Sequence, residues 1–338
     1  MTDLFRAAPH VRLHRGKTIV IKAGGGSIAR TAGLRQLARQ VSVVQALGSR
    51  VVVVHGGGPQ TDALQRMLGD EPRMIDGRRV TTPTAMRALR MATAGELNGE
   101  LVAALSAEGV PAVGVSGASA GLLLAARRPP VQTSEGLVDF GEVGDLRSVD
   151  TSSLTALLDR GFVPVVCPPA ADGQGGFLNV NADLAAASIA VALAAAKLVL
   201  VTGAPGILGN PEDPHSLASA LSLAELDAME ESGALRAGMR VKAAAIRAAL
   251  YGGVERVHVV SGSDPEALVR ELYTNHGAGT LVTREPQSAP PSDARPSEIP
   301  AQATPAPAPA QPAVPAARSV SKPMATSKRM ATSKGKAR

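Results

Sequence analysis

The chain has 338 residues, 45% of them apolar, which is enough to bury a substantial core in one large domain or two lobes. No apolar run reaches the roughly 20 residues that a membrane helix needs, and the first residues lack the apolar segment of a signal peptide, so the sequence favours a cytoplasmic protein without a membrane partner. The formal net charge of +6 originates near the C-terminus, because residues 318–338 carry seven Lys and Arg and no acid.

Short runs of β-branched residues that end at glycines and give way to helices recur along residues 17–284. The predicted strands are residues 17–21, 50–54, 110–115, 162–166, 198–201 and 257–260. Helices are predicted up to about residue 48, after Pro59, and from Leu184 to about Ala195. This repetition of βα units predicts an α/β fold with a mainly parallel sheet. Residues 136–144 alternate less regularly, and we expect them to form a hairpin at an edge of the sheet.

Two of the predicted strands end in triple glycines, Gly24–Gly26 and Gly56–Gly58. Ligands bind at the carboxyl ends of the strands in parallel α/β sheets. Glycine lets the backbone approach an anion closely, and the dipole of the following helix favours negative charge. The two turns are therefore candidate phosphate cradles, although tight βα turns without a ligand would explain either one alone. The chain contains neither a Walker A loop nor a G-x-G-x-x-G in its first βα turn.

Lys22 stands two residues before the first triple glycine, inside a strand of Val and Ile. A lysine there is costly to bury unless its ammonium meets an anion, and a transferred phosphoryl group would supply one. Two later segments leave alternatives open. Residues 179–183 either cap the alanine-rich helix or contribute to a site, and Lys242 is either a site residue or an ordinary exposed lysine. The lone Cys167 excludes an internal disulfide, and we expect it to be a buried structural thiol.

Taken in order, these pieces resemble the amino acid kinase family and, within it, the N-acetylglutamate kinases. The matching segments are IVIKAGGG (19–26), VVVVHGGGPQ (51–60), GRRVTTPTAM (77–86), AGELNGELV (94–102), VGVSG (113–117), NVNAD (179–183), GMRVKAAAIRA (238–248) and GAGTLV (277–282). They cover about residues 10–284. Each segment alone is a weak signal, but their combination in this order is highly specific.

The resemblance implies an open αβα sandwich with a mainly parallel central sheet and two lobes. The lobe of about residues 17–195 would bind the acyl amino acid, and the lobe of about residues 196–284 would bind ATP. The implied reaction is phosphorylation of the γ-carboxylate of N-acetyl-L-glutamate, the second step of arginine biosynthesis. The implied cofactors are ATP and the Mg²⁺ that accompanies it, with no metal held by the protein itself.

The resemblance also assigns roles to individual residues. It implies that Lys22 and Lys242 bind the phosphoryl group and that Asp183 orients them. The residues that it places at the phosphates are Gly24, Gly25, Gly56 and Gly57. The residues that it places at the acyl amino acid are Gly57, Gly58, Arg79 and Asn179. Ser119 and Gly203 depart from the pattern, because the family usually has an acid at each of these positions.

The two ends of the chain lie outside this kinase region. Residues 1–16 resemble the end of the extra helix of hexameric, arginine-inhibited members, so the resemblance implies a homo-oligomer, either a dimer or a hexamer. Residues 285–338 form a Pro/Ala-rich linker and a basic tail that we expect to be disordered. The tail could contact polyanions through its charge, but it has no aromatic residues on which bases could stack.

Two other functions fit parts of the sequence. A kinase for carrier-protein-linked aminoadipate or glutamate would share the fold and the lysines, and the stretch Ala204–Gly206 is similar to such enzymes. A weakly active or inactive regulatory paralogue would fit the missing acids at Ser119 and Gly203. Turnover of free N-acetylglutamate distinguishes these functions.

Overall fold

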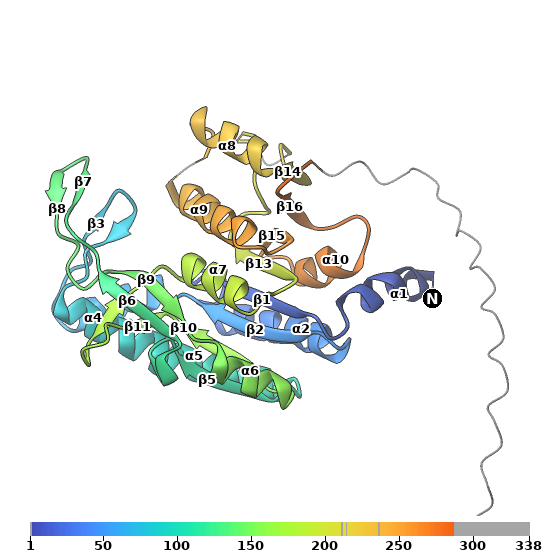
Figure 1. The fold of residues 1–338 in the computed structure, drawn as a ribbon, viewed down its shortest axis with the longest axis horizontal. Helices are drawn as coiled ribbons and strands as arrows, with labels where there is room; N and C mark the ends of the chain where they lie inside the picture. Colours follow the sequence, from blue (N-terminus) through green and yellow to red (C-terminus); the bar gives the residue numbers. More distant parts are fainter. Residues whose placement is uncertain (1, 211, 214, 236, 287–338) are drawn as a thin grey trace, which may run out of the picture. The chain divides into compact units, whose positions relative to one another are not determined.

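A central sheet runs through the structure, a computed structural model that describes residues 2–210, 212–213, 215–235 and 237–286. In these residues the sheet has eight strands in the order β14-β16-β15-β13-β1-β2-β10-β5, and its neighbours are parallel except β15 and β16 (Figure 1). The strands are β1 (Thr18–Ala23), β2 (Arg50–His55), β5 (Ala112–Ser116), β10 (Val163–Cys167), β13 (Lys197–Thr202), β14 (Ala220–Ser222), β15 (Arg256–Ser261) and β16 (Gly279–Thr283). The mainly parallel sheet confirms the predicted fold class. The Pro/Ala-rich linker and basic tail predicted at residues 285–338 lie outside the described residues, apart from 285 and 286 of the linker.

Helices cover both faces of this sheet. Their bounds are α1 (Thr2–His14), α2 (Thr31–Ala46), α3 (Gly58–Met67), α4 (Pro83–Arg90), the π-helix η1 (Met91–Leu97), α5 (Asn98–Ala107), α6 (Ser152–Asp159), α7 (Ala182–Ala192), α8 (Leu223–Glu231), α9 (Ala237–Tyr251) and α10 (Ala267–Tyr273). The core residues of α6, α7 and α9 form one cluster with one face of the sheet. Those of α2, α5 and α10 form a second cluster with the other face.

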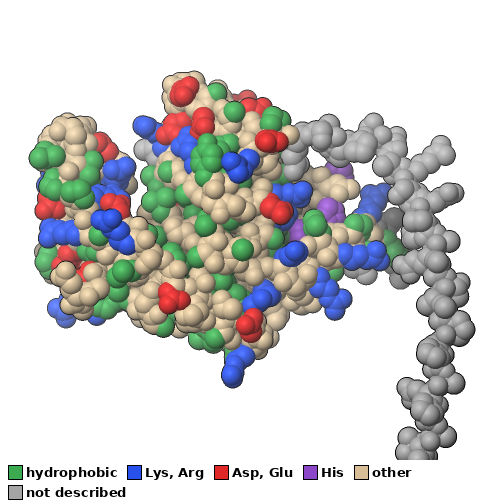
Figure 2. Space-filling model, in the orientation of Figure 1, with side chains coloured by type: hydrophobic (Ala, Val, Ile, Leu, Met, Phe, Trp, Pro, Cys, Tyr) green, Lys and Arg blue, Asp and Glu red, His purple; other side chains and the backbone are tan. Residues whose placement is uncertain are grey.

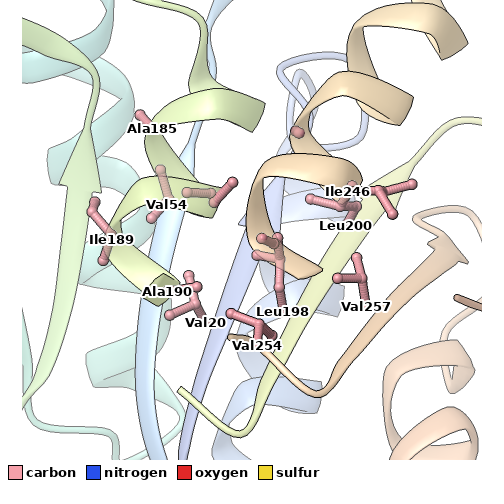
Figure 3. Close-up of a cluster of buried hydrophobic side chains, with 14 of the residues drawn as sticks. Val20, Val54, Ala185, Ile189, Ala190, Leu198, Leu200, Ile246, Val254 and Val257 are labelled. Atoms are coloured by element: carbon pink, nitrogen blue, oxygen red, sulfur yellow. The ribbon is translucent and has the colours of Figure 1, made fainter. Parts of the chain in front are cut away.

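The alternation of side chains along β1 and β2 determines which helix each residue meets. Val20 and Val54 point toward α7 and α9, whereas Ile19, Ile21 and Val53 point toward α2 and α5. Alanines on the inner face of α7 let this helix lie close to Val20 and Val54 (Figure 3). Full burial of each Val or Ile side chain contributes about 1.5–3 kcal/mol. By the same period of two, Lys22 faces α7 and α9, and His55 faces α5.

Smaller sheets lie beside the central one. A four-stranded sheet of described residues has the order β12-β11-β6-β9. Two further pairs, β3 with β4 and β7 with β8, are hairpins that project together in Figure 1. The bounds are β12 (Phe177–Asn179), β11 (Pro169–Ala171), β6 (Leu123–Arg127), β9 (Gly144–Val149), β3 (Met74–Ile75), β4 (Arg78–Arg79), β7 (Val131–Thr133) and β8 (Gly136–Val138).

The edge hairpin that we predicted at residues 136–144 is wrong in its pairing. Gly136–Val138 pairs backward with Val131–Thr133, in a hairpin separate from the central sheet. The turn falls at Ser134, whose N–H and hydroxyl both donate to the Asp76 carboxylate, at 3.1 and 2.6 Å. This long-range contact fixes the turn two residues before the predicted segment begins.

Cys167 is the last residue of β10 and is fully buried. Burial raises the pKa of its thiol to about 11, so the thiolate is scarce near neutral pH. The prediction of a structural thiol is confirmed. Among the helices of the described residues, none is long and apolar enough to cross a membrane.

Candidate active site

Lys22, Asp183 and Lys242 form one cluster at the carboxyl end of β1, in which Lys22 and Asp183 are buried and Lys242 is partly buried. Lys22 comes from the strand itself, Asp183 from the first turn of α7, and Lys242 from α9. Lys22 Nζ lies 2.7 Å from Asp183 Oδ1, and Lys242 Nζ lies 3.1 Å from Asp183 Oδ2. One carboxylate therefore bridges two ammonium groups, and the cluster retains one uncompensated positive charge.

The capping of α7 explains why the Asp183 carboxylate is free to bridge the lysines. Asn181 is the N-cap, and its Oδ1 accepts hydrogen bonds from the N–H groups of Asp183 and Leu184, at 2.9 and 3.1 Å. The sequence left open whether an Asn or Asp of this segment caps the helix or serves a site. The structure separates the two tasks, because Asn181 caps and Asp183 turns toward the lysines.

Burial sets the electrostatics of the cluster. Lys22 and Asp183 are 5% and 4% exposed. Burial lowers the pKa of the Lys22 ammonium, and although Asp183 opposes this shift, the pKa remains below its ordinary value. Burial raises the pKa of Asp183, but Lys22 and Lys242 outweigh it and hold that pKa below its usual range. An anion arriving beside Lys22 would relieve the cost of its buried charge.

The two glycine turns pack against each other above this cluster. A Cβ atom added to Gly25 would lie 2.9 Å from the Gly58 nitrogen and 3.1 Å from the Gly57 nitrogen. One added to Gly24 would lie 3.9 Å from Lys22 Nζ, so the first turn sits beside the ammonium. One added to Gly56 would lie 3.7 Å from Cβ of Ala182, at the start of α7. The sequence-predicted turns and lysines thus meet in one place.

The amide groups of the turns have different tasks. The Gly24 N–H donates to the Val201 carbonyl at 3.1 Å, and the Gly56 N–H donates to the Ala23 carbonyl at 3.0 Å, so both extend the sheet. Helix α3 begins at Gly58 with Gly57 as its N-cap, and these first N–H groups have no acceptor within the helix. The amides of Gly57 and Gly58 are thus better placed to face an anion than those of Gly24 and Gly56.

We expect Gly25→Ala to lower kcat about 10- to 100-fold, because the new methyl group collides with the backbone of the second turn and forces the turns apart. The estimate corresponds to the 1–3 kcal/mol that overpacking usually costs. Gly26→Ala is the matched control, since a Cβ atom there meets nothing within 4 Å. Steady-state kinetics and melting temperatures of both variants test this. Equal activity in the two variants would show that the approach of the turns is unimportant.

Arg79 and Asn179 lie on neighbouring segments joined through Thr81. Arg79 Nη1 forms an ion pair with Asp62 and donates to Gln65 Oε1 at 3.1 Å, while Nη2 reaches the Gly58 carbonyl at 3.4 Å. Asn179 Nδ2 donates to Thr81 Oγ1 at 3.0 Å. The structure therefore brings Arg79 to the second glycine turn, and it places Asn179 four residues before Asp183.

Sequence reasoning missed the residues that hold the Arg79 side chain in place. Asp62 and Gln65 are three residues apart on α3, so they share the helix face that meets Arg79. Gln65 Nε2 also donates to Asp70 Oδ2 at 3.0 Å, and Asp70 accepts from the hydroxyl of Thr82, the N-cap of α4. The i, i+3 spacing of Asp62 and Gln65 after the glycine turn was visible in the sequence, but it did not show that Arg79 is their partner.

Ser119 and Gly203, the two departures from the family pattern, both have unoccupied space beside them. Ser119 lines a cavity of about 880 Å³ together with Arg90 and Phe177, which are in cation–π contact at 4.0 Å. Gly203 follows β13, and a side chain there would meet nothing within 4 Å. No group of three or more His, Cys, Asp or Glu in the described residues could hold a metal ion.

The sequence and the structure both match known proteins. A profile of the amino acid kinase family matches residues 17–261, which include the whole lysine–carboxylate cluster. Acetylglutamate kinase of Myxococcus xanthus is 44% identical, over 83% of this chain and 94% of its own length. Acetylglutamate kinase of Symbiobacterium thermophilum is 40% identical, over 83% of this chain and 96% of its own. N-acetylglutamate synthase from Neisseria gonorrhoeae, complexed with coenzyme A and N-acetyl-glutamate, superposes with a TM-score of 0.74 at 32% identity, over 85% of this chain and 64% of that one.

Proposed function

The chain belongs to the amino acid kinase family, and we propose that it transfers the γ-phosphoryl group of ATP to the γ-carboxylate of N-acetyl-L-glutamate, in arginine biosynthesis. The acetylglutamate kinases of Myxococcus xanthus and Symbiobacterium thermophilum are matched over more than nine tenths of their length. The observation that carries the proposal is the Lys22–Asp183–Lys242 cluster beside two touching glycine turns. This arrangement offers positive charge and backbone N–H groups to one anionic centre.

The cluster supplies what this reaction needs. The nucleophile is already an ionised carboxylate, so no side chain has to remove a proton. Phosphoryl transfer passes through a loose, negatively charged transition state, and catalysis consists mostly of positioning and electrostatic stabilisation. We assign the transferred group to Lys22 and Lys242, whose ammonium groups Asp183 holds in place. We assign its oxygens also to the N–H groups of Gly57 and Gly58.

The nucleotide is proposed to arrive as its Mg²⁺ complex. Mg²⁺ commonly keeps several waters and binds mainly through the phosphates of the substrate. This fits a site whose one central carboxylate, Asp183, is already shared by two lysines. We therefore treat Mg²⁺ as part of the substrate rather than as a group held by the protein. Assembly of the chain into a dimer or hexamer stays a prediction, which sedimentation velocity tests.

Arg79 and Asn179 are the residues that we propose for binding the acyl amino acid. A guanidinium can bind both oxygens of a carboxylate in a planar fork, and Arg79 is held beside the second glycine turn by Asp62 and Gln65. The hairpins near this region carry mixed charge, as Figure 2 shows for the face that it displays, and Arg73 is paired with Glu135 at 2.7 Å. This mixture does not favour an acidic carrier protein as substrate.

A comparison of substrates tests the proposed function. We expect kcat/KM for ADP release to be highest with N-acetyl-L-glutamate, ahead of N-succinyl-L-glutamate, L-glutamate and 2-aminoadipate. Free glutamate should be at least about 100-fold poorer, because its charged α-ammonium group would have to be desolvated. A preference for aminoadipate, or turnover only with a carrier-linked substrate, would contradict the proposal, and so would the absence of turnover with all four.

A further inference from the structure

His55 and Asn98 form a buried polar pair that the proposed reaction does not use. His55 is the last residue of β2, directly before the second glycine turn, and is fully buried. Asn98 is the first residue of α5 and is 6% exposed. Both lie on the sheet face opposite to Lys22. His55 directly precedes a proposed phosphate turn and Asn98 contacts its ring, so this buried pair requires an account, because burial of polar groups is costly unless each hydrogen bond is satisfied.

The surroundings of Asn98 determine which way its amide points. Asn98 Nδ2 donates to the Val165 carbonyl at 2.9 Å, and only the NH₂ group can face a carbonyl oxygen. Asn98 Oδ1 fills the space above Gly114 on β5, where an added Cβ atom would lie 2.1 Å from it. Gly114 thus admits the amide, and Val165 orients it.

The orientation of Asn98 in turn determines the tautomer of His55. The same Nδ2 lies 3.1 Å from His55 Nε2, so the ring nitrogen must accept and carry no proton. The proton of the neutral ring is then on Nδ1, which lies 3.0 Å from the Gly56 carbonyl and donates to it. Burial lowers the pKa of His55 to about 4, so the ring is neutral near neutral pH.

The Gly56 carbonyl is part of the peptide that ends in the Gly57 N–H. The C=O and N–H of a trans peptide point in opposite directions, and the described residues contain no cis peptide. A carbonyl held toward His55 therefore directs the Gly57 N–H away from His55. The Gly57 nitrogen lies 3.1 Å from the place of a Cβ on Gly25, so this nitrogen lies beside the first glycine turn.

We propose that His55 and Asn98 are positioning residues that fix the Gly56–Gly57 peptide, so that the Gly57 N–H faces the phosphoryl group. Neither side chain touches the substrate. Val165 orients Asn98, Asn98 selects the tautomer of His55, and His55 holds the carbonyl that aims the N–H. The inference rests on the proposed function, because it assigns the Gly57 N–H to a transferred phosphoryl group.

Two substitutions of His55 separate this role from simple packing. In His55→Asn the side-chain NH₂ stands near the place of Nδ1 and can still donate to the Gly56 carbonyl. In His55→Gln the amide reaches the place of Nε2 and keeps a partner in Asn98, but the donor at Nδ1 is lost. We expect kcat to fall about 100-fold in His55→Gln, the usual effect of losing one such backbone donor, and to stay within about 10-fold of wild type in His55→Asn. KM for the acyl substrate should change little in either variant.

Melting temperatures of the two variants provide the control, since both replace one buried ring by one amide. Equal losses of kcat in the two variants would overturn the inference and indicate a purely structural role. Absence of turnover in the wild-type chain would instead refute the proposed function, and the kinetic comparison would then lose its basis.

A measurement that needs no activity keeps the inference testable in every case. In the full chain labelled with ¹⁵N-histidine, we expect the His55 ring to show a protonated Nδ1 and a bare Nε2, without titration between about pH 5.5 and 8.5. Among the six histidines, His258 should give a second ring of this kind, because its Nδ1 lies 2.6 Å from Glu271 Oε1. The His55 resonance should be missing from His55→Asn, which assigns it, and a through-bond correlation from the His55 backbone assigns it if that variant fails to fold. A protonated Nε2 on His55, or titration of its ring in that range, would overturn the inference.

Discussion

Lys22→Met is expected to lower kcat at least about 1,000-fold, which corresponds to about 4 kcal/mol of lost transition-state stabilisation. Methionine keeps the length and much of the volume of the side chain but removes the ammonium beside the first glycine turn. Asp183 retains Lys242 as a partner at 3.1 Å, so the variant should still fold. Because Lys22 is 5% exposed, water cannot easily replace its charge. ADP release in a coupled assay measures the loss.

Lys17→Met is the control for this substitution. Lys17 directly precedes β1 but is exposed, so its removal should change kcat by less than about twofold. Retention of near-normal turnover in Lys22→Met would refute the assignment of Lys22 to the phosphoryl group. A loss of turnover together with loss of the folded state would be visible in the melting temperature, and Lys22→Arg would then test whether positive charge at this position restores activity.

Asp183→Ala is expected to lower the free energy of unfolding by about 3–5 kcal/mol and to abolish most turnover. The carboxylate is the shared partner of two ammonium groups, and its removal leaves Lys22 buried with a like charge nearby. A buried charge without a partner is far more destabilising than an exposed one. Urea denaturation at neutral pH measures the loss of stability, and the ADP assay measures the loss of activity.

Two further variants test whether the instability of Asp183→Ala comes from an unpaired buried charge. Asp159→Ala removes an exposed partner of Arg50 and should cost no more than about 1 kcal/mol. In Lys22→Met/Asp183→Leu no buried charge is left unpaired, because Lys242 is more exposed and can turn toward water. We expect this double variant to regain most of the stability of wild type while it stays inactive. Equal instability of the single and double variants would contradict the account of the cluster.

The sequence predicted the fold well because its signals were local and repeated. The runs around Val20 and Val54 are β-branched, stop at glycines and are followed by helices, and the apolar run around Leu200 also stops at a glycine, so each of these strands could be predicted from its own segment. Lys22 could be singled out on physical grounds, as a lysine inside a buried strand. Asp183 and Lys242 could not, because a helix cap and an exposed lysine explained them equally well, and their pairing with Lys22 followed only from the family resemblance.

The remaining features depend on contacts between distant segments. The turn of the hairpin of β7 and β8 lies where Ser134 donates two hydrogen bonds to Asp76. No local sequence pattern indicates this contact. The N–H groups of Gly24 and Gly56 are used in hydrogen bonds that extend the sheet, although the triple glycines suggested that every amide could bind a phosphate. The orientation of Asn98 depends on the Val165 carbonyl of a strand far along the chain.

The most direct test of the central claim is to trap the product. With ATP, Mg²⁺, N-acetyl-L-glutamate and hydroxylamine, we predict that the wild-type chain forms ADP and the γ-hydroxamate of N-acetylglutamate in equal amounts, because hydroxylamine captures the acyl phosphate. The Lys22→Met variant should form neither above background. Release of ADP with inorganic phosphate and no hydroxamate, or no ADP at all from the wild-type chain, would contradict phosphoryl transfer to the carboxylate by this cluster.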